Sequence, residues 1–70
     1  MIKYLVIIEE NNNNYCAYVP DLPGCIATGK TKEEVEELIY DGIKFHIEGL
    51  KLEGLSIPKN KIESEVMIFA

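Results

Sequence analysis

The stretch Tyr15-Cys-Ala-Tyr-Val-Pro-Asp-Leu-Pro-Gly-Cys25 decides the fold, because it holds one strand, a tight turn and the start of the next strand. Residues Tyr15–Val19 are rich in aromatic and apolar side chains, which is typical of a strand. Pro20 ends that strand, since proline has no backbone N–H to give to a ladder. Cys25–Thr28 predicts a second, short strand, which Gly29 ends.

The turn between these two strands is Asp21–Gly24. Pro23 fixes φ at the second turn position, and Gly24 supplies the positive φ that a type II turn requires next. Backbone geometry is enough to explain both residues. Loops nevertheless often carry recognition, so we also consider Asp21 and Leu22 as candidate contacts with a partner.

Another strand precedes this stretch. Ile2–Glu9 is rich in β-branched and aromatic residues, and its middle, from Leu5 to Ile8, is apolar on both faces. This pattern favours a central strand, or one whose second face is covered by another subunit. The four asparagines within Glu10–Asn14 predict a hairpin loop between the first two strands.

A helix is expected after the third strand. Thr31 and Glu34 form a capping box, and apolar or small residues then recur at helical spacing as far as position 50. Asp41-Gly42 could mark a turn that splits this segment, since glycine within a helix costs about 1 kcal/mol. The apolar stripe keeps its phase, however, which favours one helix in which Gly42 allows close approach to the sheet. Gly54 is the expected end.

An alternating pattern predicts a last strand at Glu65–Phe69, with Val66 and Ile68 on one face and Met67 and Phe69 on the other. The predicted fold class is α+β, in the order β-β-β-α-β. It comprises a three- to four-stranded, mostly antiparallel sheet with one helix packed on one face, and residues 1–70 form a single domain. Because an exposed sheet edge invites pairing, we expect the last strand to form a homodimer or a higher homo-oligomer.

Charge and composition exclude several classes of function. Twelve acidic residues face seven lysines and no arginine, so the net charge is −5. Nucleic acids are bound chiefly through cations, so direct binding of DNA or RNA is not expected. The longest apolar run, Tyr4–Ile8, is far shorter than the roughly 20 residues of a membrane span, and there is no signal-peptide pattern. We expect a cytoplasmic protein that makes no membrane contact. The acidic charge suits a basic partner, or simply serves solubility.

Few residues could carry catalysis or hold a metal ion. Cys25 and His46 could pair as nucleophile and base, but no third group is evident to orient the histidine. Together with Cys16 they match no known spacing of metal ligands, and both cysteines are expected to be small, buried hydrophobes. A nuclease would need several carboxylates at the sheet centre, where Leu5–Ile7 stand instead. We expect no enzyme activity, no cofactor and no metal.

Nearly the whole chain resembles the HicB antitoxin family. The resemblance rests on five segments: Tyr15–Cys25, Ala27–Thr31 with the acidic residues that follow it, Ile47–Leu50, Glu53-Gly54 and Ile57-Pro58. It implies a truncated ribonuclease-H-like fold and an antitoxin that masks HicA, a small basic toxin that cleaves messenger RNA. Many members also carry a DNA-binding segment after this domain. Here no such segment follows the last strand, so operon repression is not expected.

The partner that the resemblance implies is a HicA-like basic ribonuclease. We expect it to meet the acidic residues of the first helical turns, with the turn before the third strand as a further contact; the candidates are Asp21, Leu22, Glu33, Glu36, Glu37 and Asp41. The alternative is a stand-alone oligomeric regulator or scaffold without a toxin. A short basic reading frame beside the gene would decide for the antitoxin.

Overall fold

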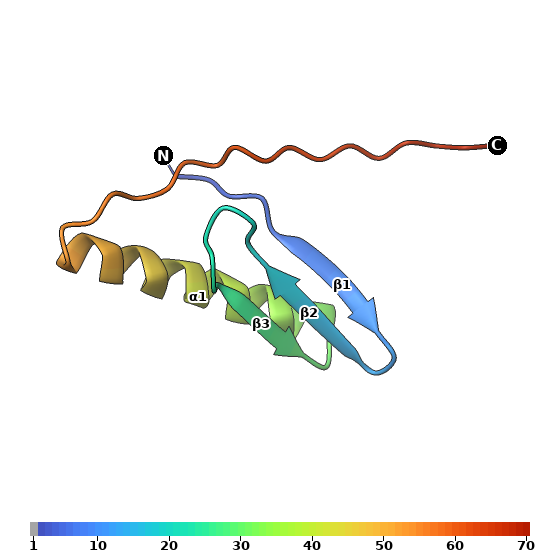
Figure 1. Cartoon of the computed structure of the whole chain (residues 1–70). Coiled ribbons are helices and arrows are strands. Elements are labelled where there is room, and N and C mark those ends of the chain that lie inside the picture. The colour runs from blue at the N-terminus through green and yellow to red at the C-terminus, as the bar shows by residue number, and fades with distance from the viewer. Residues whose placement is uncertain (1) are drawn as a thin grey trace.

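Three short strands and one long helix are found in residues 2–70, the part of the chain that the computed structural model describes (Figure 1). The strands are β1 (Ile7–Asn11), β2 (Asn14–Tyr18) and β3 (Ile26–Gly29), and the helix α1 spans Lys32–Leu52. The strands form an antiparallel sheet in the order β1-β2-β3, so β1 and β3 are its edges. The predicted α+β class is confirmed, and the element order is consistent with a truncated ribonuclease-H-like fold.

The first strand begins at Ile7, not at Ile2 as the sequence predicts. The β1–β2 ladder ends, on the side of the N-terminus, with the pair Ile7 and Tyr18. If the register continued, Leu5 would lie opposite Pro20. Proline has no N–H to donate, so the ladder cannot continue there. The backbone N–H of Leu5 donates instead to Asn60 Oδ1, at 2.9 Å. Residues 2–6 are therefore extended but lie outside the ladder.

The turn after β2 is held by three backbone hydrogen bonds. Val19 N donates to Cys25 O at 3.2 Å, Leu22 N to Val19 O at 3.0 Å, and Cys25 N to Leu22 O at 3.1 Å. Gly24 has a φ of 84°, which confirms the positive φ predicted for the position after Pro23. This backbone path turns the side chain of Leu22 inward, where it is fully buried.

The helix starts at the predicted cap. The Thr31 hydroxyl accepts from Glu34 N at 3.1 Å. The Glu34 carboxylate accepts in turn from Lys30 N at 3.2 Å, one residue earlier than in the usual capping box. From this cap α1 continues through Gly42 without a break. The alternative turn at Asp41-Gly42 is therefore not formed.

A Schellman motif ends the helix. Gly54 has a φ of 70° and its N–H donates to Lys51 O at 3.1 Å, while Leu55 N donates to Leu50 O at 2.9 Å. The left-handed conformation at this position favours glycine, since other residues carry a Cβ that clashes there. The predicted helix end at Gly54 is confirmed.

The core lies between α1 and the β2–β3 half of the sheet. Val35 and Ile39 are the buried residues of α1. They share one cluster with buried residues of β2 and of the following turn: Ala17, Val19, Leu22 and Cys25. Because the helix packs against β3 and β2, strand β1 lies to one side of it and is less covered.

Replacing the helical glycines by alanine should stabilise the protein. A Cβ at Gly49 would meet no atom within 4 Å, and a Cβ at Gly42 would lie 3.8 Å from Cys25 Sγ, an ordinary contact. The sequence-based explanation of Gly42, that it allows close approach to the sheet, is thus not needed, because a Cβ also fits at this position. Since alanine is the better helix former, each substitution should raise the free energy of unfolding by about 0.5–1 kcal/mol, as measured by urea denaturation.

Gly29→Ala is the control for this pair. A Cβ at Gly29 would lie 2.9 Å from Glu34 Oε1 and 3.2 Å from Val35 N. The Glu34 carboxylate would have to move away from Lys30 N, which it now caps, and Val35 N would have to give by a few tenths of an ångström. The same chemical change should therefore not bring the gain in stability expected at Gly42 and Gly49. If Gly49→Ala lowered the free energy of unfolding, the expectation that alanine favours this helix over glycine would be wrong.

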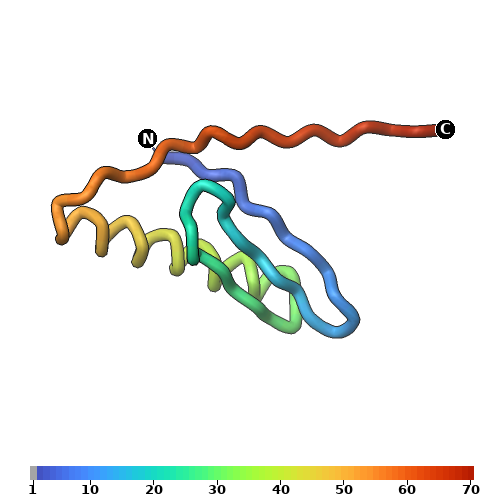
Figure 2. Tube along the Cα trace, in the orientation of Figure 1, coloured from blue at the N-terminus to red at the C-terminus, as the bar shows by residue number. Residues whose placement is uncertain are grey.

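After α1 the chain is extended as far as residue 70 (Figures 1 and 2). Residues 57–62, called the connector here, pass beside residues 2–6. Residues 63–70, called the arm, run away from the body of the molecule. Within residues 2–70 the arm pairs with no other segment. The last strand predicted at Glu65–Phe69 is therefore not formed in the single chain, because an alternating pattern sets side-chain faces but supplies no neighbouring strand.

Candidate functional site

The turn residue Asp21 anchors the connector. Its Oδ2 accepts from Lys61 N at 2.8 Å and from Ile62 N at 3.1 Å. Beside it, Tyr4 OH donates to the carbonyl oxygen of Pro58. Burial, together with the nearby charge of Asp21, raises the pKa of the Tyr4 hydroxyl, which favours the protonated form that this bond needs. One oxygen of the Asp21 carboxylate is thus engaged by its own chain. The contact with a partner that the sequence suggests for Asp21 stays a prediction.

Leu22 does not form part of a surface. None of its side chain is exposed, so a partner could reach it only by opening the core. This corrects the sequence-based choice of Leu22 as a partner contact. The turn is also remote from the acidic part of the helix. Asp21 follows the end of β2, whereas Glu33 lies near Tyr15 at the start of that strand, and five strand residues span roughly 17 Å.

The other four predicted contacts are exposed on α1: Glu33, Glu36, Glu37 and Asp41. Successive residues of a helix are rotated by about 100° around its axis. Around this axis Glu37 lies about 40° from Glu33, and Glu36 lies about 60° from Glu33 on the other side. Asp41 lies about 80° from Glu33, and Lys44 follows it within one turn. We therefore define the acidic face as Glu33, Glu36 and Glu37, with Asp41 at its margin.

The sheet adds a carboxylate to this face that the sequence analysis missed. Tyr15 OH donates to Glu10 Oε2 at 3.3 Å. The Glu10 charge is the main cause of a raised pKa at the Tyr15 hydroxyl, with smaller contributions from burial and from the charge of Glu33. Glu10 on β1 and Glu33 on α1 therefore act on the same tyrosine. The register of β1 and β2, which sets Glu10 opposite Tyr15, is what brings them together.

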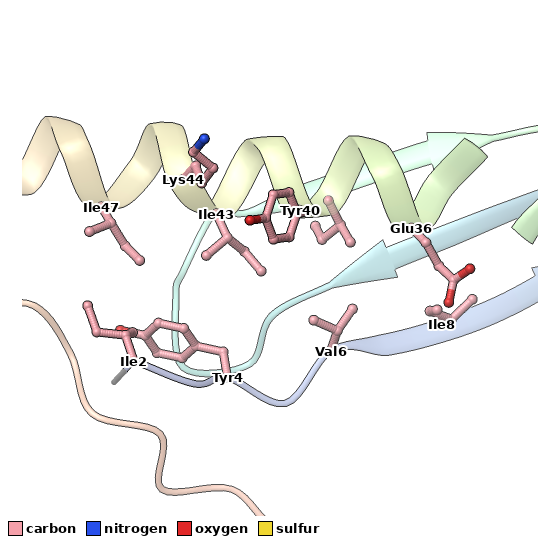
Figure 3. Close-up of a pocket in the computed structure, with 10 residues that line it drawn as sticks. Ile2, Tyr4, Val6, Ile8, Glu36, Tyr40, Ile43, Lys44 and Ile47 are labelled. Carbon is pink, nitrogen blue, oxygen red and sulfur yellow. The ribbon is translucent and has the colours of Figure 1, made fainter. Parts of the chain in front are cut away.

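An apolar groove adjoins the acidic face. It lies between the β1 side of the sheet and α1, with a volume of about 480 Å³. Tyr4, Val6 and Ile8 line one wall, and Ile39, Tyr40, Ile43 and Ile47 line the other. Figure 3 shows Glu36 directed toward Ile8 at one end of the groove, whereas the Lys44 amine points away. The groove exists because α1 covers β2 and β3 and leaves this side of β1 open.

The residues considered for catalysis lie in settings that suit packing. Cys25 is buried within the core cluster, and burial raises the pKa of its thiol, which disfavours the thiolate that a nucleophile needs. Cys16 and His46 are half-buried. Among residues 2–70, no group of three or more His, Cys, Asp or Glu side chains is arranged to hold a metal ion.

These features define a small α+β protein whose surface carries a set of carboxylates beside an apolar groove. The family profile described as HicB_like antitoxin of bacterial toxin-antitoxin system matches residues 4–67. The match covers most of the chain, which therefore belongs to the HicB-like antitoxin family. No solved structure shows a significant match. In the part of the chain that the structure describes, no helix is long and apolar enough to span a membrane.

Relatives of the chain come from bacteria, an archaeon and a phage. A UPF0150 protein of Thermoplasma acidophilum is 40% identical over 70 residues, covering 99% of this chain and 100% of that protein. An uncharacterized 14.9 kDa protein of the rep-hol intergenic region of Haemophilus phage HP1 is 39% identical over 64 residues. That match covers 90% of this chain but 48% of the phage protein, so the chain spans about half the length of that relative. A UPF0150 protein of Helicobacter pylori is 34% identical over 55 residues, 79% of this chain and 76% of that protein.

Proposed function

We propose that the protein is an antitoxin that neutralises a HicA-type toxin, a basic ribonuclease that cleaves messenger RNA, by covering its RNA-binding surface. Membership of the HicB-like antitoxin family supports a role in a toxin-antitoxin system. An enzyme that cleaves RNA must offer cations to phosphate groups. A protein that presents carboxylates in a fixed arrangement can compete with RNA for those cations.

The acidic face is the observation that carries this proposal. Glu33, Glu36 and Glu37 are exposed in the first two turns of a helix whose start is fixed by the Thr31 cap. Glu10 extends the face onto the sheet. Helix and strand positions hold these carboxylates in place, so less side-chain and backbone freedom is lost when a partner binds.

The proposal also covers what the protein does not do. Burial of the Cys25 thiol argues against a nucleophile, so we propose a binding protein without enzyme activity. With a net charge of −5, direct binding to nucleic acid is not part of its role. Self-association into a homodimer or higher oligomer is part of the proposal. The competing function is a stand-alone oligomeric regulator or scaffold without a toxin, which the exposed apolar residues of the arm also suit.

The direct test uses the product of a short basic reading frame beside the gene. Purified toxin is incubated with a messenger RNA, and this protein is added in increasing amounts. We expect cleavage to stop near a one-to-one ratio of chains, with the toxin alone as the control. Binding without loss of cleavage would overturn the masking mechanism. No binding at all would favour the scaffold.

A further inference from the structure

The arm exposes apolar side chains that the rest of the chain leaves without cover. Val66 is 93% exposed, Ile68 94% and Phe69 87%, and Met67 is 70% exposed. They follow one another in an extended run, so they alternate between two faces. Side chains of this size are normally buried, and a continuous set of them in water marks an interaction surface.

The arm cannot fill the groove of its own chain from the position it occupies. Its root is fixed where Asp21 binds the backbone of Lys61 and Ile62, and from there it runs outward (Figure 1). The radius of gyration is 13.7 Å, against about 11 Å for a compact domain of this length. The long dimension of 48 Å, beside 27 and 19 Å in the other directions, fits an arm that projects into solvent.

The chain also carries a surface that fits such an arm. Strand β1 is an edge of the sheet, so one side of its backbone lacks a strand neighbour within the described chain. The apolar groove lies along the same side, between β1 and α1. A strand added at this edge would place every second side chain over the groove and would bond to the free backbone of β1. The arm has eight residues, more than the five of β1, so it is long enough to pair along the whole of this strand.

We propose that the arm of one copy binds a second copy, as a fourth strand beside β1 with alternate side chains in the groove. Arm and groove belong to the same chain, so each copy can donate and receive, and the exchange closes as a twofold dimer. The groove then gains the cover that α1 does not give it. This inference rests on the self-association in the proposed function and names the surfaces that would carry it. It concerns the sheet edge and not the acidic face, so its test is separate from that of toxin binding.

The first experiment measures the mass of the full chain by light scattering at micromolar concentration. The wild type should have about twice the chain mass of 7.9 kDa. Met67→Asp with Ile68→Asp places a charge on each face of the arm and should give the mass of a single chain. Asn12→Asp with Asn13→Asp is the matched control, because it adds the same charge in the exposed hairpin turn. A monomeric wild type, or a dimeric arm variant, would overturn the proposal.

The second experiment locates the receiving surface on α1. Tyr40 lines the groove and is 64% exposed, whereas Phe45 is 80% exposed and does not line it. Tyr40→Glu should weaken the dimer at least tenfold, and Phe45→Glu should leave it unchanged, with the helix content of both checked by circular dichroism. The reverse result would move the interface to the other flank of α1, where Leu38, Phe45 and Leu52 are exposed.

The third experiment separates exchange between chains from folding back within one chain. One batch carries Cys16→Ser and a spin label on Ala70→Cys, beside the apolar residues of the arm and not in place of one; it is mixed with isotope-labelled wild-type chain. If the arm crosses to a partner, amide signals of Val6 and Ile8 in the labelled chains should broaden in the mixed sample. Undiminished signals in a mixed dimer would show that the arm stays on its own chain, and the exchange would be excluded.

Discussion

Replacing Leu22 by alanine should lower the free energy of unfolding by about 2–5 kcal/mol, the range found for leucine-to-alanine changes in protein cores. The Leu22 side chain is fully buried and belongs to the core cluster with Val35 and Ile39. A domain of this size has only about 3–5 kcal/mol of stability from its core. The variant should therefore be largely unfolded at room temperature. Urea denaturation followed by circular dichroism, at matched protein concentration, measures the loss.

Leu52→Ala is the matched control. Leu52 is 88% exposed at the end of α1, so the same chemical change should alter stability by no more than about 0.5 kcal/mol. This pair also decides between two roles for Leu22. A folded Leu22→Ala variant that had lost affinity for its partner would restore the partner contact predicted from sequence. A variant that has lost the fold supports the core position.

Reversing charge on the acidic face should slow binding to a basic toxin by about tenfold or more at low salt. The variant is Glu33→Lys with Glu37→Lys, which changes the net charge from −5 by four units to −1. Glu34 is left in place because it bonds to the backbone of Lys30, and Glu36 because it lines the groove. Steering between opposite charges is screened by salt. The association rate of the variant should therefore also depend less on ionic strength.

The control reverses two exposed carboxylates outside the acidic face, Glu48→Lys with Glu53→Lys, and reaches the same net charge. If the acidic face steers the toxin, the control should associate faster than the Glu33 and Glu37 variant at low salt, and the two rates should converge as the salt concentration rises. Equal association rates for the two variants would mean that the net charge of the protein, and not the acidic face, sets the rate. Lysines near the start of a helix also cost about 0.3–1 kcal/mol each, so the stability of both variants should be measured first.

The parts of the fold that depend on neighbouring residues could be predicted from sequence. The Pro23-Gly24 pair determines the turn in which it lies. The Thr31 side chain caps the helix by accepting from the N–H of Glu34, three residues later. Each signal and its effect therefore lie within a few positions of each other. The glycine stop at position 54 is a signal of the same kind. Local backbone chemistry determines all three, and all three are confirmed.

Features that depend on distant partners could not be predicted in this way. The bonds from Lys61 and Ile62 to Asp21 join residues 40 and 41 positions apart, and nothing near Asp21 indicates them. Its position in a turn predicts a partner contact and gives no sign of these bonds. The place of Glu10 could not be predicted for the same reason, because its bond with Tyr15 follows from strand register. The arm has the alternating pattern of a strand, but this pattern does not determine which strand lies beside it.

The attachment of the connector has a consequence for how the protein opens. Contacts within the hairpin and between α1 and β3 join nearby parts of the chain, whereas Tyr4 and Pro58 are 54 positions apart. The connector is held by a few hydrogen bonds near the surface and adds no residue to the buried core. Segments attached in this way detach at a lower free energy than the core unfolds. The connector and arm therefore form a separate opening unit that can be released and recaptured while the hairpin, turn and helix stay folded.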